Sequence, residues 1–335
     1  MLTTLHEAEA DPRPKERAPG LRVALFGGFG IGNFGNDASL EAVLSFLRAE
    51  QPGLELSCIC SEPTVVSARY GAPAIPTARR PHGPWRVLDT LLLRQPSLWT
   101  NWLARLSAVR RYDAIVVAGT GVFDDFRDSP LGWPSRLLLW CMAARLHGVP
   151  VAFLSVGAGP IVNPVSRLLM KAAAQLAQHR SYRDADSRDY MRSIGVDESR
   201  STVLPDLAFL LPAPAEKPRP ADAPLTVGVG VMNYRGWRDS GTVFDDYVDT
   251  HVRLIEWVQA RGWNTRVVIG QAPTDLVAVR EIEKRLGRPL TGPREASMSS
   301  IHDAMEAIGE TDLVVASRYH VQIAALKMRR PLISL

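Results

Sequence analysis

Short apolar stretches that end in glycine alternate with helical patterns along most of this chain. The clearest are Asp113–Ala118, followed by Gly119, and Val151–Val156, followed by Gly157. An uninterrupted apolar run of this length is typical of a strand that is buried on both faces, as in parallel sheets. Because a helical pattern follows each run, the sequence predicts repeated strand–helix units in a doubly wound α/β fold.

One proline-rich segment interrupts the alternation. Residues 211–224 read LPAPAEKPRPADAP, with five prolines, and this composition predicts a stiff connector that packs poorly. Because Leu335 ends an apolar strand pattern with no covering element after it, we expect the natural chain to continue. The strand–helix pattern restarts after the connector, so we predict a disordered arm over residues 1–20, a Rossmann-like domain over 21–210, a linker over 211–224 and a second Rossmann-like domain over 225–335.

Charge and cysteine content exclude several classes of protein. The chain has 39 Lys and Arg against 35 Asp and Glu, and its net charge of +4 is too small for a protein that coats nucleic acid. Three cysteines favour a reducing compartment over a disulfide framework. Cys58 and Cys60 lack the second pair that a zinc site of this kind would need, so we expect no metal.

No stretch of the sequence predicts a signal peptide or a membrane span. The first twenty residues are polar and charged, and the longest uncharged stretch, residues 146–166, is interrupted by glycines and prolines. We therefore expect a cytoplasmic protein, whose contact with a membrane would be peripheral and would come through a lipid-linked substrate. The sequence leaves the oligomeric state open.

A glycine-rich turn joins the first predicted strand to the first predicted helix. It spans residues 27–35, and Asn33, Asn36 and Asp37 crowd its end. Backbone amides in such a turn, and the helix N-terminus after it, favour anionic ligands. Part of the turn fits the G-x-G-x-x-G pattern of dinucleotide sites. Side chains that bind hydroxyls nevertheless suit a sugar, or a structural cap, better than a pyrophosphate.

Polar side chains follow two further predicted strands. Asp124 and Asp125 come shortly after the strand at 113–118, and Arg183 ends a strand that starts at Arg180. Ligands of open α/β sheets bind beyond the carboxyl ends of the strands. The two carboxylates therefore fit sugar hydroxyls, or equally a helix cap or a solvated loop. Helix capping does not explain Arg183, whose guanidinium suits a carboxylate or a phosphate.

The sharpest signal lies near the end of the chain. Ser317, Arg318 and His320 follow an apolar strand pattern and open a helix. An arginine there can bind an anion through two hydrogen bonds, and a histidine titrates near neutral pH and can transfer a proton. Arg235, just past the first strand of the second domain, is either a further anion-binding residue or a surface arginine.

Taken in order, these segments resemble the polysaccharide pyruvyl transferase family. The family's motifs and their counterparts here are G-N-x-G-D-E at Gly32–Asp37, G-G-G-x-F-x-D at Gly119–Asp125, R-D-x-x-S at Arg183–Ser187, D-P-A-F at Asp206–Phe209, and R-x-H at Arg318–His320.

The resemblance implies two Rossmann-like domains facing a cleft, as in GT-B glycosyltransferases. It implies phosphoenolpyruvate as co-substrate, a saccharide acceptor that is lipid-linked in some cases, and no cofactor. The alternatives are a GT-B glycosyltransferase that uses a nucleotide sugar and a non-catalytic carbohydrate-binding protein. The expected roles are catalysis by His320, Arg318 and Arg183, donor binding by Arg235, Ser317 and Arg318, and acceptor binding by Asn33, Asn36, Asp37, Asp124 and Asp125.

Overall fold

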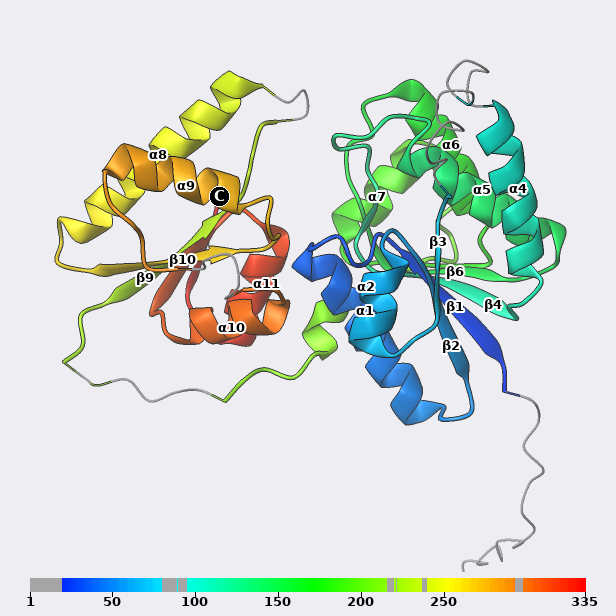
Figure 1. The fold of residues 1–335 in the computed structure, drawn as a ribbon, viewed down its shortest axis with the longest axis horizontal. Coiled ribbons are helices and arrows are strands. Elements are labelled where there is room, and N and C mark those ends of the chain that lie inside the picture. The colour runs from blue at the N-terminus through cyan, green and yellow to red at the C-terminus, as the bar shows by residue number, and fades with distance from the viewer. Residues whose placement is uncertain are drawn as a thin grey trace, which may run out of the picture.

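Two all-parallel sheets, each with helices on both faces, make up the chain (Figure 1). The computed structural model describes residues 20–79, 89, 95–215, 220, 222–236, 240–292 and 298–335. The predicted arm therefore lies outside the described residues, apart from Gly20. The doubly wound α/β architecture that the alternating pattern predicts is confirmed.

The first sheet has the order β3-β2-β1-β4-β6-β7-β8, and the short strand β5 pairs separately with β6. Its strands are β1 (Arg22–Gly27), β2 (Glu55–Cys60), β3 (Ala74–Pro76), β4 (Ala114–Ala118), β5 (Gly121–Phe123), β6 (Val151–Ala158), β7 (His179–Tyr182) and β8 (Thr202–Val203). Its helices are α1 (Phe34–Glu50), α2 (Pro63–Tyr70), α4 (Gln95–Val109), α5 (Trp133–Leu146), α6 (Pro164–Leu176), α7 (Ala185–Ser193) and the 3-10 helix η1 (Leu207–Leu210).

The second sheet has the order β10-β9-β11-β12. Its strands are β9 (Thr226–Val231), β10 (Asn264–Ile269), β11 (Leu313–Ala316) and β12 (Leu332–Ser334), and its helices are α8 (Gly241–Gln259), α9 (Leu276–Leu286), α10 (Ile301–Gly309) and α11 (Tyr319–Lys327). Between β8 and β9 runs the proline-rich stretch, of which residues 216–219 and 221 lie outside the described residues. In the part of the chain that the structure describes, no helix is long and apolar enough to cross a membrane.

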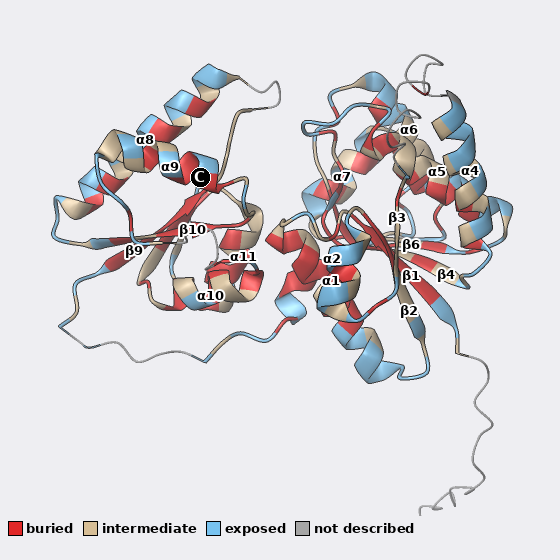
Figure 2. Ribbon diagram, viewed as in Figure 1, coloured by how far each residue is buried: buried red, intermediate tan, exposed pale blue. Residues whose placement is uncertain are grey.

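Burial follows the layered arrangement. The central strands are buried and the helices expose their outward sides (Figure 2). All six residues of β9 are buried, which is the result expected for a central parallel strand covered on both faces. Helix α1 begins at Phe34, three residues before the predicted start, because the Asn33 side chain caps it by accepting from the amides of Gly35 and Asn36.

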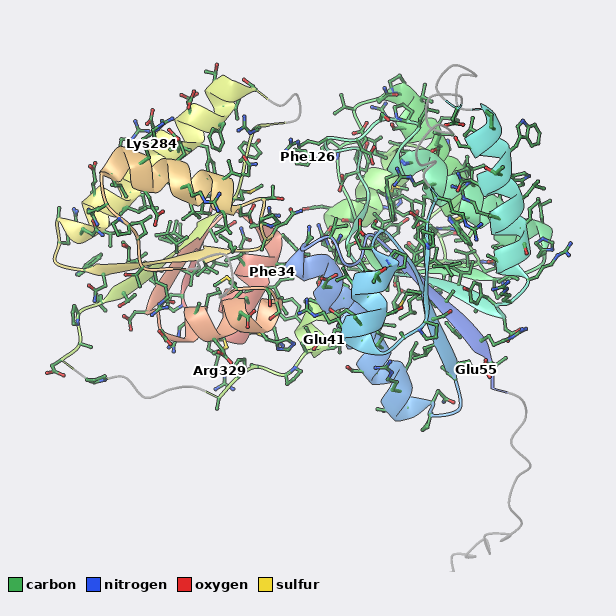
Figure 3. The ribbon with its side chains drawn as sticks, viewed as in Figure 1. Phe34, Glu41, Glu55, Phe126, Lys284 and Arg329 are labelled. Atoms are coloured by element: carbon green, nitrogen blue, oxygen red, sulfur yellow. The ribbon has the colours of Figure 1, made fainter. Side chains whose placement is uncertain are left out.

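The two sheets meet along α1, η1 and α11. Helix η1 packs against both α1 and α11, and Phe34 points from the start of α1 toward the second domain (Figure 3). The backbone amide of Phe34 donates to the Gly270 carbonyl at 2.9 Å, and that of Ala272 donates to the Gly32 carbonyl at 3.1 Å. The glycine-rich turn is thereby held against the loop after β10.

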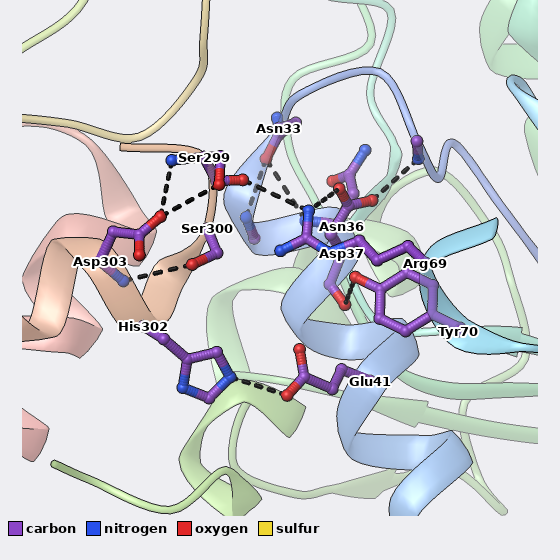
Figure 4. Close-up of polar contacts among 12 residues, drawn as sticks. Asn33, Asn36, Asp37, Glu41, Arg69, Tyr70, Ser299, Ser300, His302 and Asp303 are labelled. Atoms are coloured by element: carbon purple, nitrogen blue, oxygen red, sulfur yellow. Dashed lines mark hydrogen bonds and ion pairs between the residues drawn. The ribbon is translucent and has the colours of Figure 1, made fainter. Parts of the chain in front are cut away.

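Side chains add to this contact on the α1–α10 side. His302 Nε2 on α10 lies 2.7 Å from Glu41 Oε1 on α1, and Arg69 Nη1 donates to the Ser299 carbonyl (Figure 4). The His302 and Glu41 side chains are 34% and 28% exposed, so each bond is weak by itself. Together with the backbone bonds they fix how the two domains face each other.

Candidate active site

A cleft of about 1220 Å³ lies between the two domains and is lined from both. The residues that line it come mainly from loops and helix starts at the carboxyl ends of β1, β4, β6, β7, β9 and β11, which is where ligands bind in open α/β sheets. Of the residues that the sequence predicts for the site, the cleft is lined by Asn33, Asn36, Asp124, Arg183, Ser317, Arg318 and His320.

His320 lies at the first turn of α11 and reaches across to the first domain. Its Nε2 is 3.6 Å from Asp206 Oδ2, and its side chain is 13% exposed. The ring lies so close to the Cα of Gly35 that a Cβ there would overlap it. The imidazole is therefore held between a glycine of the N-terminal turn and a buried carboxylate.

Arg183, just after β7, shares the same carboxylate. Its Nη1 lies 3.8 Å from Asp206 Oδ2, and its guanidinium stacks 3.9 Å above the ring of Tyr319. Gly157 leaves the space for it, since a Cβ there would come within 2.6 Å of the guanidinium carbon. The Arg183 side chain is 18% exposed, so a cationic group borders the cleft in a largely desolvated position, where an anion is bound more strongly than in water.

Asp206 is the buried anion that organises this end of the cleft. Burial alone would raise the pKa of its carboxyl, but His320, the Ala208 amide and Arg183 together outweigh burial and lower that pKa. The carboxylate therefore stays ionised at neutral pH. It lies beside both the guanidinium of Arg183 and the imidazole of His320.

Arg318 is held by a second buried carboxylate, Asp275. Arg318 Nε and Nη2 donate to the two Asp275 oxygens at 2.8 and 2.6 Å. The same carboxylate accepts from the amides of Asn233, Gly270 and Gln271. This bidentate pair fixes the guanidinium plane at the floor of the cleft.

In the N-terminal turn, two of the predicted acceptor residues border the cleft and one does not. Asn33 caps α1, and Asn36 Nδ2 donates to the Gly28 carbonyl at 2.9 Å; both line the cleft. Asp37 is buried, accepts from the Gly30 amide at 2.8 Å and lies 3.7 Å from Arg69. Its carboxylate does not line the cleft and stabilises the glycine-rich turn.

The neighbouring carboxylates after β5 point in different directions. Asp124 lines the cleft, and burial raises the pKa of its carboxyl to about 6 even though the Phe126 amide and Arg183 lower it. Asp125 is buried and accepts from the amides of Val162 and Asn163 at 2.9 and 2.8 Å. Only Asp124 is therefore placed to meet a ligand.

Arg235 does not line the cleft. Its Nε donates to Asn233 Oδ1 at 3.2 Å, and its guanidinium stacks 4.3 Å above the Phe244 ring. Ser317 lines the cleft, and its hydroxyl is buried. Of the three predicted donor-binding residues, Ser317 and Arg318 thus border the cavity.

Sequence reasoning did not assign a role to several residues that shape the cleft. Asp275 and His251 belong to no sequence motif, and Asp206 belongs only to a motif of the family resemblance. His251 on α8 lines the cleft with its Nδ1 2.8 Å from the Tyr247 carbonyl oxygen, and burial lowers the pKa of its ring. Asp206 and Asp275 each follow the end of a strand, and this position is the sequence feature that could have predicted a role for them in the cleft.

Within the described residues, no group of His, Cys, Asp and Glu side chains lies close enough together to hold a metal ion.

Replacing Asp125 should test its structural role. Asp125→Ala leaves two backbone amides without an acceptor, so we expect the free energy of unfolding to fall by about 1–3 kcal/mol. Urea denaturation measures this. Asp128→Ala is the comparison, because the exposed Asp128 carboxylate also accepts two backbone amides, those of Ser129 and Trp133, which water can satisfy once the carboxylate is removed. An Asp125→Ala protein as stable as the wild type would contradict the assignment.

Asp124 should make stability depend on pH. Its carboxyl has a pKa of about 6 in the folded chain against 3.8 as the ordinary value, so the folded state binds the proton more tightly. Its contribution to stability is therefore lost as the pH rises from about 4 to about 6. We expect Asp124→Asn to melt higher than the wild type at pH 7, with the difference vanishing near pH 4. Thermal unfolding from pH 4 to pH 7 measures this difference. If the melting temperatures of the two proteins differ by the same amount at every pH, the raised pKa of Asp124 is refuted.

Several solved structures share the fold of this chain. One is S. aureus MnaA with UDP, with a TM-score of 0.59 and 11% identity over 94% of this chain and 79% of that one. Another is the UDP-GlcNAc 2-epimerase of Neisseria meningitidis bound to UDP-GlcNAc, with a TM-score of 0.56 and 13% identity over 94% of this chain and 82% of that one. A third is the lipopolysaccharide outer core galactosyltransferase WaaB, with a TM-score of 0.51 and 10% identity over 94% of this chain and 80% of that one. At these identities the likeness concerns the fold, and it confirms the predicted GT-B-like architecture.

Sequence comparison identifies the family. No curated protein matches the chain. The model of the polysaccharide pyruvyl transferase family, however, matches residues 33–335, which includes the end of the glycine-rich turn, both buried carboxylates and the Arg318–His320 segment. The chain therefore belongs to the polysaccharide pyruvyl transferase family.

Proposed function

We propose that this protein transfers a pyruvyl group, as a ketal, from phosphoenolpyruvate to a saccharide in the biosynthesis of an exopolysaccharide or a cell-envelope glycan. The observation that carries the proposal is the meeting of His320, Arg183 and Asp206 at one end of the cleft, beside Arg318. Two arginines and one imidazole provide two anion contacts and one proton donor. Phosphoenolpyruvate carries two anionic groups and one carbon that must be protonated.

The donor would be held by the cationic end of the cleft. Arg183 borders the cavity between two carboxylates: its Nε lies 3.5 Å from Asp184 Oδ2 and its Nη1 lies 3.8 Å from Asp206 Oδ2, which is shared with His320. The pair with Asp275 engages Nε and Nη2 of Arg318, so the donors on Nη1 stay available for a phosphate or carboxylate oxygen. The Ser317 hydroxyl beside them adds a neutral hydrogen-bonding group.

The reaction would proceed by protonation of the donor. His320 gives a proton to the methylene carbon, which becomes the methyl group, and the neighbouring carbon becomes an oxocarbenium-like centre. One acceptor hydroxyl adds to that carbon and loses its proton. The C–O bond to phosphate then breaks, and a second acceptor hydroxyl adds and loses its proton to complete the ketal. Arg183 and Arg318 would stabilise the departing phosphate.

The acceptor would bind on the first-domain side of the cleft, where Asn33, Asn36 and Asp124 line it. Amide and carboxylate oxygens at such positions accept hydrogen bonds from sugar hydroxyls. Asp124, with its raised pKa, is a stronger base than an ordinary carboxylate and suits removal of a hydroxyl proton.

Replacing the imidazole tests the mechanism. We expect His320→Ala to lower phosphate release from phosphoenolpyruvate by about 10²–10⁴-fold, the usual contribution of a general acid. His302→Ala is the matched control, because His302 is also paired with a carboxylate but lies on α10 outside the lining of the cleft. Unchanged turnover in His320→Ala would remove the proposed mechanism.

The choice of donor is tested by thermal shift. Phosphoenolpyruvate should raise the melting temperature of the wild type. A rise with uridine diphosphate and none with phosphoenolpyruvate would favour a nucleotide-sugar glycosyltransferase. The acceptor is sought in a screen of lipid-linked and free saccharides. If phosphate is released from phosphoenolpyruvate but no saccharide in the screen receives the pyruvyl group, the proposed transfer step is contradicted.

The contact between Gly35 and His320 supplies a second test. A methyl group at residue 35 would displace the imidazole, and a misplacement of about 1 Å costs on the order of 10²-fold in rate. We expect Gly35→Ala to lose turnover to this extent while still folding. Gly53→Ala is the control, since no atom lies within 4 Å of a Cβ at that position. Full activity in Gly35→Ala would mean that His320 need not occupy this place.

A further inference from the structure

Three helices on one face of the first sheet carry no acidic residue. Helices α4, α5 and α6 lie side by side, α5 packing against both neighbours (Figure 1), and their sequences contain neither Asp nor Glu. Residues 90–183 as a whole have eleven Lys and Arg against four Asp. By contrast, α8 in the second domain alone has three Asp and one Glu. Basic residues thus outnumber acidic ones in this part of the sequence, and Arg105 among them is buried while Arg180 and Arg183 lie beside carboxylates.

The same helices expose large apolar side chains. These residues are 38–72% exposed, so a large part of each is in contact with water. We call them, together with the turns that lead into α5 and α6, the outer helix face: Leu98, Trp99 and Leu103 on α4, Leu131 before α5, Met142 and Leu146 on α5, Val162 before α6, and Val165 and Leu168 on α6. Exposed basic residues lie on and beside the same helices, namely Arg110, Arg111, Arg145 and Arg167.

The outer helix face continues to the mouth of the cleft. Trp133 and Arg136 in the first turn of α5 line the cleft, as does Pro160 just before α6. Asp125 ties the two lead-in turns together by accepting from the amides of Val162 and Asn163. Phe126 borders the gap between the domains (Figure 3) and lines the cleft. A surface seated on the outer helix face would thus lie next to the opening of the active site.

We propose that the outer helix face docks on the surface of a bilayer that contains anionic phospholipids. Exposed leucine, valine and tryptophan side chains on helices that contain basic and no acidic residues are a composition that binds in the headgroup region. There, apolar groups enter the acyl boundary, and Lys and Arg meet anionic headgroups. An ordinary exposed helix carries charges of both signs, as α8 does. The docking itself does not depend on the proposed reaction. Its benefit to catalysis, namely presenting a lipid-linked saccharide to the cleft, rests on the proposed function.

Vesicle sedimentation of the full chain tests the docking. The wild type should sediment with vesicles of phosphatidylglycerol and phosphatidylcholine, less with pure phosphatidylcholine, and less again when salt is added, because screening weakens the attraction. The double variant Trp99→Glu, Leu168→Glu removes two apolar contacts and adds two charges that the surface repels. We expect its partition onto the anionic vesicles to fall at least about tenfold.

Trp257→Glu is the matched control. Trp257 is 50% exposed, comparable with 64% for Trp99, but lies on the acidic helix α8. It should leave vesicle binding unchanged, and thermal unfolding should show that all variants fold. The proposal is overturned if the wild type ignores anionic vesicles, or if Trp257→Glu loses as much binding as the double variant. A wild type that ignores vesicles but forms an oligomer that the double variant lacks would make this face a protein interface instead.

Turnover separates this inference from the proposed function. With a water-soluble saccharide acceptor, the double variant should release phosphate from phosphoenolpyruvate as fast as the wild type, since none of its changes lies in the cleft. Vesicle binding without any pyruvyl transfer would leave the docking intact and reject the reaction. A double variant that binds vesicles as well as the wild type would reject the docking and leave the proposed reaction intact.

Discussion

The close approach of His320 to Gly35 is the contact on which the site depends. The imidazole comes from the second domain and the glycine from the first, and no side chain stands between them. This approach is possible because the backbone of residues 32–34 bonds to that of residues 270–272. The cleft and the meeting of His320 with Arg183 therefore exist only when the two sheets are docked in this way, with η1 packed between α1 and α11.

Two buried carboxylates hold the cationic groups in place. Asp206 faces His320 and Arg183, and Asp275 takes Arg318 through two hydrogen bonds. Burying a charge is costly unless it is paired, and each carboxylate also accepts backbone amides that offset that cost. The arrangement keeps the positive groups oriented in the absence of a bound anion, so little reorganisation would be needed to bind one.

The first domain carries both one side of the cleft and the outer helix face. Its sheet presents the glycine-rich turn and Asp124 to the cleft, while the helices on one face of that sheet lack acidic residues and expose apolar side chains. The start of α5 contributes to both, because Trp133 and Arg136 line the cleft at the end of a helix whose far end exposes Met142 and Leu146. The geometry thus links the mouth of the site to a surface suited to a bilayer.

The sequence by itself determined the parallel α/β architecture and the position of Arg318 and His320 at a strand end, because apolar runs and helical periods are local patterns. Only the tertiary structure decided which polar residues meet the cleft. Asp124 lines it while Asp125 and Asp37 turn to backbone amides, since adjacent residues in a turn point in different directions. The partners Asp206 and Asp275 lie far along the chain from the groups they hold, and Arg235 packs on Phe244 outside the cleft. Such pairings depend on how distant segments pack, which no local pattern encodes.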